Sequence, residues 1–450
     1  MLLTHLHALS RHVPEPTIAP GGVVAGSCAF VGRSPSRSAL HAFYEEAQER
    51  CSTTARVLLL DDLNEQTGLG FGFLALHAIF LQALSENRTL LPSSSVLRGE
   101  TWRWCDEGPK DYSCYFEPWS SGECARGVAS DNNNGNDIVR WDAASLGQAS
   151  LHARVVRLRM TDDPTQETVF RIYRSWMHCV PGIGRSWWWG ATWDILLRFK
   201  PFVEKAALDF LSSHGVRLAG TTAAEPFVVV IIRHGGKHVE ERLVTVHEYI
   251  KPLERLLSST CLNGKHVLLV TETKRVVDNF TATCERKGWN CFYTDQRRMD
   301  LNIDPWNPSD PRNTHGAAQK QALFGGEKAS FASKSAMLHH IGWHSILNLA
   351  VSQHASGLIG SFGSSWSALT LTMMHRQRNA PVLGCSLRPG WKNDNMYTRF
   401  TPEGPKGVQH VTAQCRRLMT PVCKGGELMY EGLGLTWHVN NRPLREGVIS

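Results

Sequence analysis

The segment Pro226-Phe-Val-Val-Val-Ile-Ile232, followed by Arg233-His-Gly-Gly-Lys237, decides the class of fold. Its apolar, mostly β-branched residues predict a strand that is buried on both faces, and the glycines between two cations end that strand. In open α/β sheets, ligands bind beyond the carboxyl ends of the strands. Arginine and lysine beside bare glycine backbone suit an anionic group such as a diphosphate, with Glu241 close behind. The alternative is that Arg233 and Lys237 are solvated loop charges and that Glu241 begins a helix.

The chain beyond this strand alternates between strand-like and helix-like segments. Strands are expected at 227–232, 266–271, 357–359 and 381–383, and helices at 246–257, 274–287, 336–354 and 367–375. A polar loop is expected at 297–330. Such alternation is typical of a parallel sheet with helices on both faces, so we predict a Rossmann-like, doubly wound α/β domain.

The amino-terminal half has the pattern of a second α/β domain. A strand at 56–60, a glycine turn at Thr67–Phe73, a helix over 76–84 and a strand at 89–91 follow one another. The glycine spacing does not match the dinucleotide-binding fingerprint. A tryptophan-rich helix is expected from Ser186, with a break at Pro201 and a second helix to His214.

Length and composition indicate a folded protein of two domains. The chain has 450 residues, of which 42% are hydrophobic and 20% charged. The expected parts are a poorly ordered lead with a helix near its end (1–50), two α/β domains (51–215 and 216–385) and a carboxyl-terminal tail (386–450). The net charge of +7 is spread without a cationic block, so no nucleic-acid partner is expected. No apolar run is long enough to span a bilayer, so neither a membrane anchor nor a signal sequence is visible.

A second anion site is expected at the turn Gly360-Ser-Phe-Gly-Ser-Ser365, which leads into a helix. Helix-start amides and the helix dipole favour phosphate oxygens without a further cation. The usual alternative is that Ser364 or Ser365 only caps the helix. His340 and His344 have the spacing of metal ligands, but no third ligand is evident, so no metal is expected.

The cysteines and the glycosylation sequons do not determine whether the protein lies in a reducing or an oxidising compartment. Four of the twelve cysteines crowd together in the amino-terminal half without CxxC spacing, at Cys51, Cys105, Cys114 and Cys124. That spacing makes a zinc ribbon improbable and favours disulfides if the compartment is oxidising. The sequons at Asn87 and Asn279 permit glycosylation but do not prove secretion.

Several of these segments, taken in order, resemble the α-1,6-fucosyltransferases, which include the core N-glycan enzyme of animals and the rhizobial Nod-factor enzyme. The resemblance covers about residues 50 to 385 and rests on the order of its elements. These are Gly68–Gly72, Asn87–Leu90, Thr101–Arg103, the tryptophan-rich helix ending at Pro201, the Arg233 segment, and Val351–Gln353 to Ser365.

The resemblance implies an enzyme of the two-domain GT-B fold. Such an enzyme uses GDP-fucose, inverts the anomeric carbon and needs no metal or other cofactor. It implies a GlcNAc-containing glycan as acceptor, α-1,6 transfer to the N-glycan core, and a Golgi or secretory-lumen location, and it allows a homodimer. The first domain would then face the acceptor and the second would bind the nucleotide sugar.

The resemblance also assigns roles to individual residues. Arg233 matches the arginine that holds the β-phosphate of the donor, Lys237 matches a following lysine, and Glu241 falls where the family keeps its catalytic base. The other residues that it places at the donor are His234, Tyr249, Glu272, Ser364 and Ser365. It further implies a disulfide between Cys51 and Cys124, with Cys105 and Cys114 as a second pair.

Three positions beside Arg233 depart from the family pattern. Ile231 replaces a histidine, His234 replaces a second arginine, and Gly236 replaces an aspartate. These changes keep two alternatives open. One is another GT-B glycosyltransferase, either an O-fucosyltransferase or an enzyme for a different nucleotide sugar. The other is a non-catalytic glycan-binding homologue.

Overall fold

The structure is a computed structural model, and the chain forms two compact units in it. It describes residues 37–49, 56–60, 69–92, 105, 112–119, 138–140, 153–158, 185–218, 225–233, 244–258, 264–296, 331–361, 364–374, 383–387, 421–424, 427–430 and 435–438. The first unit comprises Met1–Trp102 with Pro109–Arg198, and the second comprises Arg103–Gly108 with Phe199–Ser450.

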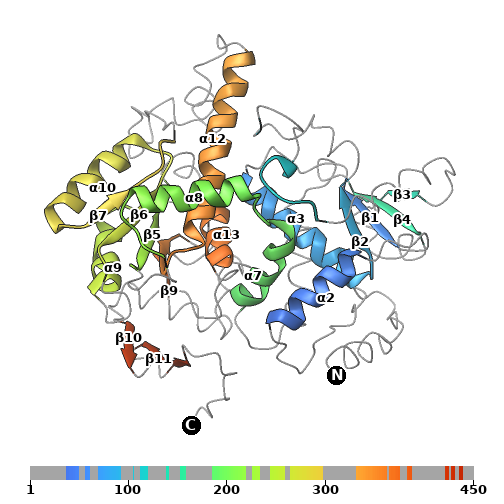
Figure 1. Ribbon diagram of the computed structural model, residues 1–450, viewed down its shortest axis with the longest axis horizontal. Coiled ribbons are helices and arrows are strands. Elements are labelled where there is room, and N and C mark those ends of the chain that lie inside the picture. The colour runs from blue at the N-terminus through green and yellow to red at the C-terminus, as the bar shows by residue number, and fades with distance from the viewer. Residues whose placement is uncertain are drawn as a thin grey trace, which may run out of the picture. The chain divides into compact units, whose positions relative to one another are not determined.

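The second unit contains a five-stranded parallel sheet in the order β7-β6-β5-β8-β9 (Figure 1). Its strands are β5 (Phe227–Ile231), β6 (His266–Val270), β7 (Asn290–Phe292), β8 (Gly357–Gly360) and β9 (Leu383–Ser386). Counted along the chain, this order is 3-2-1-4-5, the strand order of a Rossmann fold. The predicted doubly wound parallel sheet is therefore confirmed.

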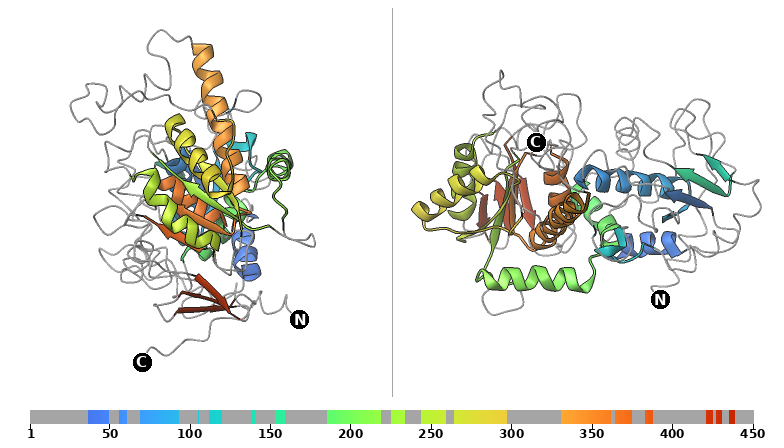
Figure 2. Two further views of the ribbon diagram at one scale, coloured as in Figure 1. Left: turned by 90° about the vertical axis from the view of Figure 1, so that its left-hand side faces the viewer. Right: turned by 90° about the horizontal axis from the view of Figure 1, so that it is seen from above.

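Helices cover both faces of this sheet (Figure 2). On one face lie α9 (Val246–Ser258) and α10 (Lys274–Lys287), and on the other lie α12 (Phe331–Ser352) and α13 (Ser365–Met374). A further helix, α8 (Pro201–Ser213), packs against α12, where Phe202 stacks on Trp343 with ring centroids 6.0 Å apart. All five helices agree with the expected helical segments, although α12 begins earlier than the expected residue 336.

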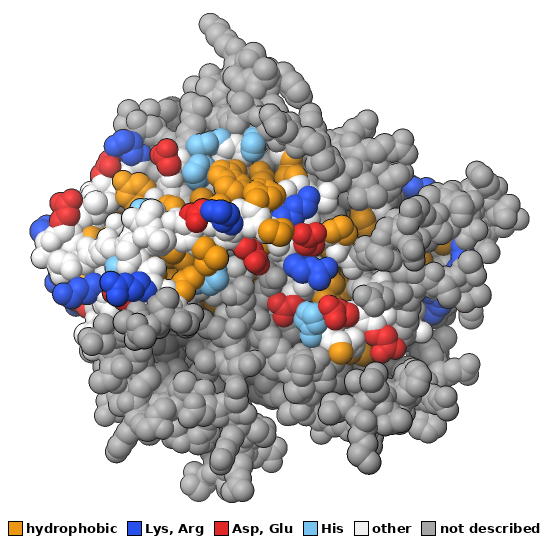
Figure 3. All heavy atoms as spheres, viewed as in Figure 1, with side chains coloured by type: hydrophobic (Ala, Val, Ile, Leu, Met, Phe, Trp, Pro, Cys, Tyr) orange, Lys and Arg blue, Asp and Glu red, His pale blue; other side chains and the backbone are white. Residues whose placement is uncertain are grey.

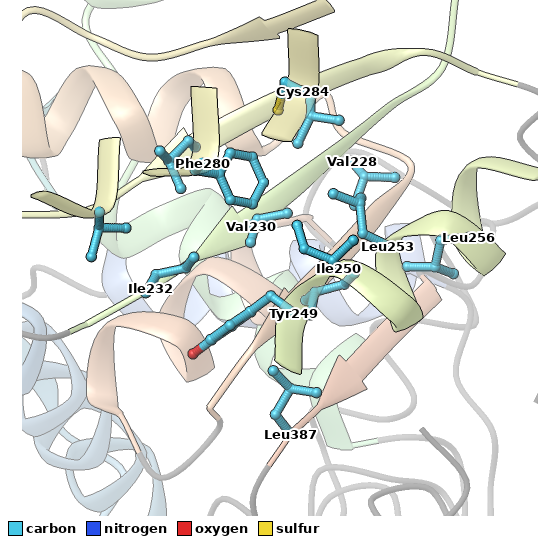
Figure 4. Close-up of a cluster of buried hydrophobic side chains, with 14 of the residues drawn as sticks. Val228, Val230, Ile232, Tyr249, Ile250, Leu253, Leu256, Phe280, Cys284 and Leu387 are labelled. Carbon is cyan, nitrogen blue, oxygen red and sulfur yellow. The ribbon is translucent and has the colours of Figure 1, made fainter. Parts of the chain in front are cut away.

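The central strand β5 is buried on both faces, as the sequence predicts. Val228, Val230 and Ile232 point into a core that α9 and α10 complete (Figure 4). Val229 and Ile231 on the opposite face are equally buried, at 0% and 1% exposure. Burial of each such side chain stabilises the fold by roughly 1.5–3 kcal/mol, so β5 is a rigid base for the residues at its end.

Two strands of this sheet differ from expectation. β7 was not expected, because its three residues contain no apolar run from which a strand could be predicted. β9 spans Leu383–Ser386, where pairing with β8 sets its register, while the expected strand was 381–383, of which 381 and 382 lie outside the described residues. The expected polar loop at 297–330 lies outside the described residues.

The first unit contains a four-stranded parallel sheet in the order β2-β1-β4-β3. Its strands are β1 (Val57–Leu60), β2 (Thr89–Pro92), β3 (Ile138–Arg140) and β4 (Val155–Leu158), and its helices are α2 (Arg37–Glu49), α3 (Leu69–Ser85) and α7 (Arg185–Leu196). Gln48 of α2 exchanges two hydrogen bonds with the Leu90 backbone, so α2 belongs to this unit and not to a separate lead. The expected glycine turn is wrong in part, because α3 already includes Gly70 and Gly72.

A buried ion pair between Arg88 and Glu86 lies at the edge of the first sheet where its strands begin. The Arg88 guanidinium lies 2.7 Å from the Glu86 carboxylate and donates to the carbonyls of Val57, Ala153 and Arg154. Burial lowers the pKa of Arg88, and the Glu86 carboxylate opposes that change. The guanidinium therefore joins β1, β2 and β4 through one side chain.

Arg88→Met should lower the free energy of unfolding by about 3–5 kcal/mol, because it leaves the Glu86 carboxylate buried without its cation. A urea titration measures the change. The matched control is Lys205→Met, which breaks an exposed pair with Asp209 and should cost at most about 1 kcal/mol. Equal losses in the two variants would show that Arg88 has no special role.

A disulfide that the sequence did not suggest lies in the second unit. Cys284 of α10 is bonded to Cys291 of β7, across a turn where Gly288 has φ 66°. Cys105 and Cys114 are also disulfide-bonded, while their expected pairing with each other stays a prediction. The expected Cys51–Cys124 pair lies outside the described residues.

The carboxyl-terminal segment, expected as a tail, contains regular structure. Three antiparallel strands form a meander: β10 (Pro421–Lys424), β11 (Glu427–Tyr430) and β12 (Leu435–His438). Among the described residues, no helix is both long enough and apolar enough to span a membrane.

Candidate functional site

The candidate site lies at the carboxyl edge of the second sheet, where three neighbouring strands end. Arg233 follows β5, Glu272 follows β6, and Ser361 and Ser364 follow β8. The strands β6, β5 and β8 are adjacent, so the residues after them meet at one edge. The chain leaves β5 toward α9 on one face and leaves β8 toward α13 on the other. This divergence is the topological switch point at which open α/β sheets bind ligands.

Arg233 connects the three strand ends. Its Nε donates to Oε1 of Glu272 at 3.4 Å, and its Nη1 donates to Oγ of Ser364 at 3.4 Å. The Arg233 side chain is 36% exposed and that of Glu272 is 17% exposed. Among the described residues, Nη2 of Arg233 has no hydrogen-bond partner. The guanidinium is thus held from two sides and keeps donors for an anion.

The start of α13 supplies a second set of donors. Ser364 precedes the helix, accepts a hydrogen bond from the Ala368 amide at 3.0 Å and is itself buried. The first amides of a helix have no intrahelical acceptor and carry the positive end of the helix dipole. Ser365 is the first residue of α13 and is partly exposed. The expected anion turn is therefore beside Arg233, which contacts it through Ser364.

Two buried hydroxyls at this turn have no partner among the described residues. These are Oγ of Ser361, whose residue is 9% exposed, and Oγ of Ser367, whose residue is 0% exposed. A buried hydroxyl without a partner is costly, and a bound oxyanion would accept its hydrogen bond. Ser361 lies in the expected anion turn, but only Ser364 and Ser365 of that turn were expected as donor contacts. The signal that would have found it is its place directly after β8.

Gly360 allows β8 and α13 to approach each other closely. A Cβ atom added at Gly360 would lie 3.0 Å from Oγ and 3.3 Å from Cβ of Ser367. The amide of Leu387 also donates to the Gly360 carbonyl at 2.9 Å. The glycine therefore serves the packing of the turn.

Glu272 lies in a short connection between β6 and α10. The amide of Thr273 donates to Oγ1 of Thr271 at 3.3 Å, and α10 begins at Lys274. Thr271 and Thr273 are both buried, which fixes the backbone on either side of Glu272. The carboxylate is held beside Arg233 by this local structure.

The other expected donor residues fall into two groups. Tyr249 is 2% exposed and belongs to the core cluster of the second unit (Figure 4). A contact of Tyr249 with the donor stays a prediction. His234, Lys237 and Glu241 lie outside the described residues, so their roles also stay predictions.

The expected metal-like histidine pair is close together but forms no complete metal site. The rings of His340 and His344 are 4.4 Å apart, and Nε2 of His340 lies 3.1 Å from the Asp295 carbonyl oxygen. Within the described part of the chain, no three His, Cys, Asp or Glu side chains are grouped as metal ligands.

The described surface carries charged, hydrophobic and histidine side chains. Figure 3 shows charges of both signs interspersed, with a cluster of hydrophobic and histidine side chains over α8 and α12. Phe202 of α8 is 50% exposed.

In the first unit, Trp193 is fully buried against His77, and burial lowers the His77 pKa to about 3, which keeps that ring neutral. The side chains of Trp187, Trp188 and Trp189 in the tryptophan-rich helix lie outside the described residues.

Comparisons with known proteins give structural similarity only. No family model matches the sequence, and no curated protein matches it. One similar solved structure is the α-1,6-fucosyltransferase NodZ co-crystallised with GDP, with a TM-score of 0.38, 11% identity, and coverage of 70% of this chain and 92% of that chain. NodZ from Bradyrhizobium has a TM-score of 0.38 and 12% identity, over 70% of this chain and 93% of that chain. POFUT1 in complex with GDP-fucose has a TM-score of 0.40 and 10% identity, over 75% of this chain and 98% of that chain. At these scores, the fold assignment rests on the parallel strand order and the helix layers of each unit.

Proposed function

We propose that this chain is an inverting, metal-independent glycosyltransferase of the GT-B type that transfers fucose from GDP-fucose to a GlcNAc-containing glycan. The proposed linkage is α-1,6 on the N-glycan core. One observation carries the proposal: Arg233 joins the ends of β5, β6 and β8 at the switch point of a Rossmann-like sheet, beside the start of α13. Guanidinium donors and helix-start amides together suit a diphosphate.

The proposed reaction is a single displacement at the anomeric carbon of fucose. The acceptor hydroxyl oxygen forms a bond to that carbon while the bond to the β-phosphate oxygen breaks, and the electron pair leaves with GDP. Arg233, Lys237 and the α13 amides would stabilise the growing negative charge on the diphosphate. Glu241 would take the hydroxyl proton as general base. Attack opposite the leaving group inverts the configuration.

The identity of the nucleotide and the sugar is inferred from the motif resemblance. Ile231, which stands where the family has a histidine, is 1% exposed inside β5 and therefore offers no polar contact to a donor. Selectivity for guanine must then come from other residues of the site. The proposed location is the lumen of the secretory pathway, and the Cys284–Cys291 bond supports it because disulfides persist in oxidising compartments.

Product analysis tests the proposed reaction. Purified protein is incubated with GDP-fucose and a GlcNAc-terminated N-glycan, and mass spectrometry follows the gain of one fucose on the acceptor and the release of GDP. UDP- and GDP-linked sugars other than fucose serve as alternative donors. Transfer of another sugar would make the chain a different glycosyltransferase. Absence of both transfer and GDP binding would favour the glycan-binding alternative.

EDTA should leave the transfer rate unchanged, because cationic side chains and helix-start amides take the place of a divalent ion on the diphosphate. The measurement is the initial rate with and without chelator, with added manganese as the control. Loss of activity that manganese restores would contradict the assignment of Arg233 to the leaving group.

A further inference from the structure

The Glu272 carboxylate contacts the Arg233 guanidinium and is therefore placed to orient that side chain. The distance from Arg233 Nε to Glu272 Oε1 is 3.4 Å, and the carboxylate is the less exposed partner, at 17% against 36%. In many Rossmann folds, an acidic residue after the second strand binds a ribose hydroxyl. Here β6 is that second strand, but the carboxylate that follows it is engaged with the arginine of the neighbouring strand.

Nε is the nitrogen of the Arg233 guanidinium that donates a hydrogen bond to Glu272. Arginine presents five N–H donors in a fixed planar fork, so a partner at Nε determines where the remaining donors point. Ser364 accepts from Nη1, which fixes a second corner of the same plane. Because Nε and Nη1 donate to acceptors that follow different strands, these two contacts define the plane of the guanidinium and so the direction of Nη2.

We infer that Glu272 is a positioning residue that orients Arg233 toward a diphosphate, and that it does not itself bind the nucleoside. This inference rests on the proposed function. Two acceptors on Arg233 reduce the conformational entropy that the arginine loses on binding an anion, which raises its affinity for that anion. The amide of Thr273 donates to Oγ1 of Thr271, and both threonines are buried, so the backbone that carries Glu272 is held in place.

The test compares GDP with inorganic pyrophosphate, which shares the diphosphate but lacks the nucleoside. In Glu272→Ala, affinities for both ligands should fall by the same factor of about ten, equivalent to about 1.4 kcal/mol, while Glu272→Gln, which keeps an acceptor oxygen, should lose less. Glu272→Ala should have no further effect when added to Arg233→Ala, since the two residues act as one unit. The matched control is Asp278→Ala, which breaks an exposed pair with Lys274 on α10 and should change neither affinity.

Three outcomes would overturn the inference. Loss of GDP affinity alone, with pyrophosphate binding intact, would place Glu272 at the nucleoside. Unchanged binding of both ligands by Glu272→Ala, in protein with an unchanged melting temperature, would show that Arg233 needs no positioning. Failure of the wild-type protein to bind either ligand would instead refute the diphosphate site itself, and with it the proposed function.

Discussion

Arg233→Ala is expected to lower both donor affinity and turnover, each by about tenfold or more. The guanidinium would donate charge-assisted hydrogen bonds to the diphosphate in the ground state, and such bonds contribute about 1.5–3 kcal/mol. The same bonds strengthen as negative charge develops on the departing GDP, so part of the loss falls on turnover. Calorimetry with GDP and steady-state kinetics with GDP-fucose measure the two effects separately.

Two control variants isolate the role of the guanidinium. Arg233→Lys keeps a positive charge but loses the planar fork, so it should retain part of the affinity and lose the contacts to Glu272 and Ser364. Arg275→Ala removes an exposed cation from the start of α10 in the same unit and should change nothing. If Arg233→Ala binds GDP as well as Arg275→Ala does, the diphosphate lies elsewhere.

Glu241→Gln is expected to reduce turnover by roughly 100-fold or more while GDP affinity stays almost unchanged. Glutamine keeps the size of the side chain but cannot accept the proton of the acceptor hydroxyl. Single-turnover rates with GDP-fucose and a GlcNAc-terminated N-glycan measure the chemical step. Together with Arg233→Ala, this variant separates the base from the residue that holds the leaving group.

The neighbouring carboxylate provides the matched control. Glu240→Gln removes the same charge one residue earlier and should retain near-normal turnover. The opposite result, with Glu240→Gln inactive and Glu241→Gln active, would move the base to Glu240. If both variants retain turnover, Glu272 is the next carboxylate to test, and its inferred positioning role would need revision.

The fold of the second unit was predictable because its signals are local. The β-branched run of β5 and the apolar periodicity of α10 specify their own secondary structure, and α10 spans Lys274–Lys287 as expected. The meeting of Arg233 with the Ser364 turn was also predictable, since the carboxyl ends of parallel strands share one edge. The sequence therefore predicted that Arg233 and the Ser364 turn lie at the same edge of the sheet.

The contacts that sequence reasoning missed depend on tertiary structure. The register of β9 is set by β8, and the Cys284–Cys291 bond requires the end of α10 to pack against β7. Ser361 lies in the expected turn, but the burial of its hydroxyl without a partner among the described residues depends on tertiary packing. Likewise, the pairing of Glu272 with Arg233 required the order of strands β5 and β6 in the sheet.

Calorimetric titration of the full chain with GDP, UDP and GDP-fucose measures directly whether Arg233 and the start of α13 bind the donor diphosphate. We expect that GDP and GDP-fucose bind, that UDP binds more weakly, and that Glu241→Gln keeps this pattern while Arg233→Ala loses it. Binding of GDP that is unaffected by Arg233→Ala, or no binding of GDP by the wild-type chain, would contradict the claim that Arg233 and the start of α13 form a donor diphosphate site.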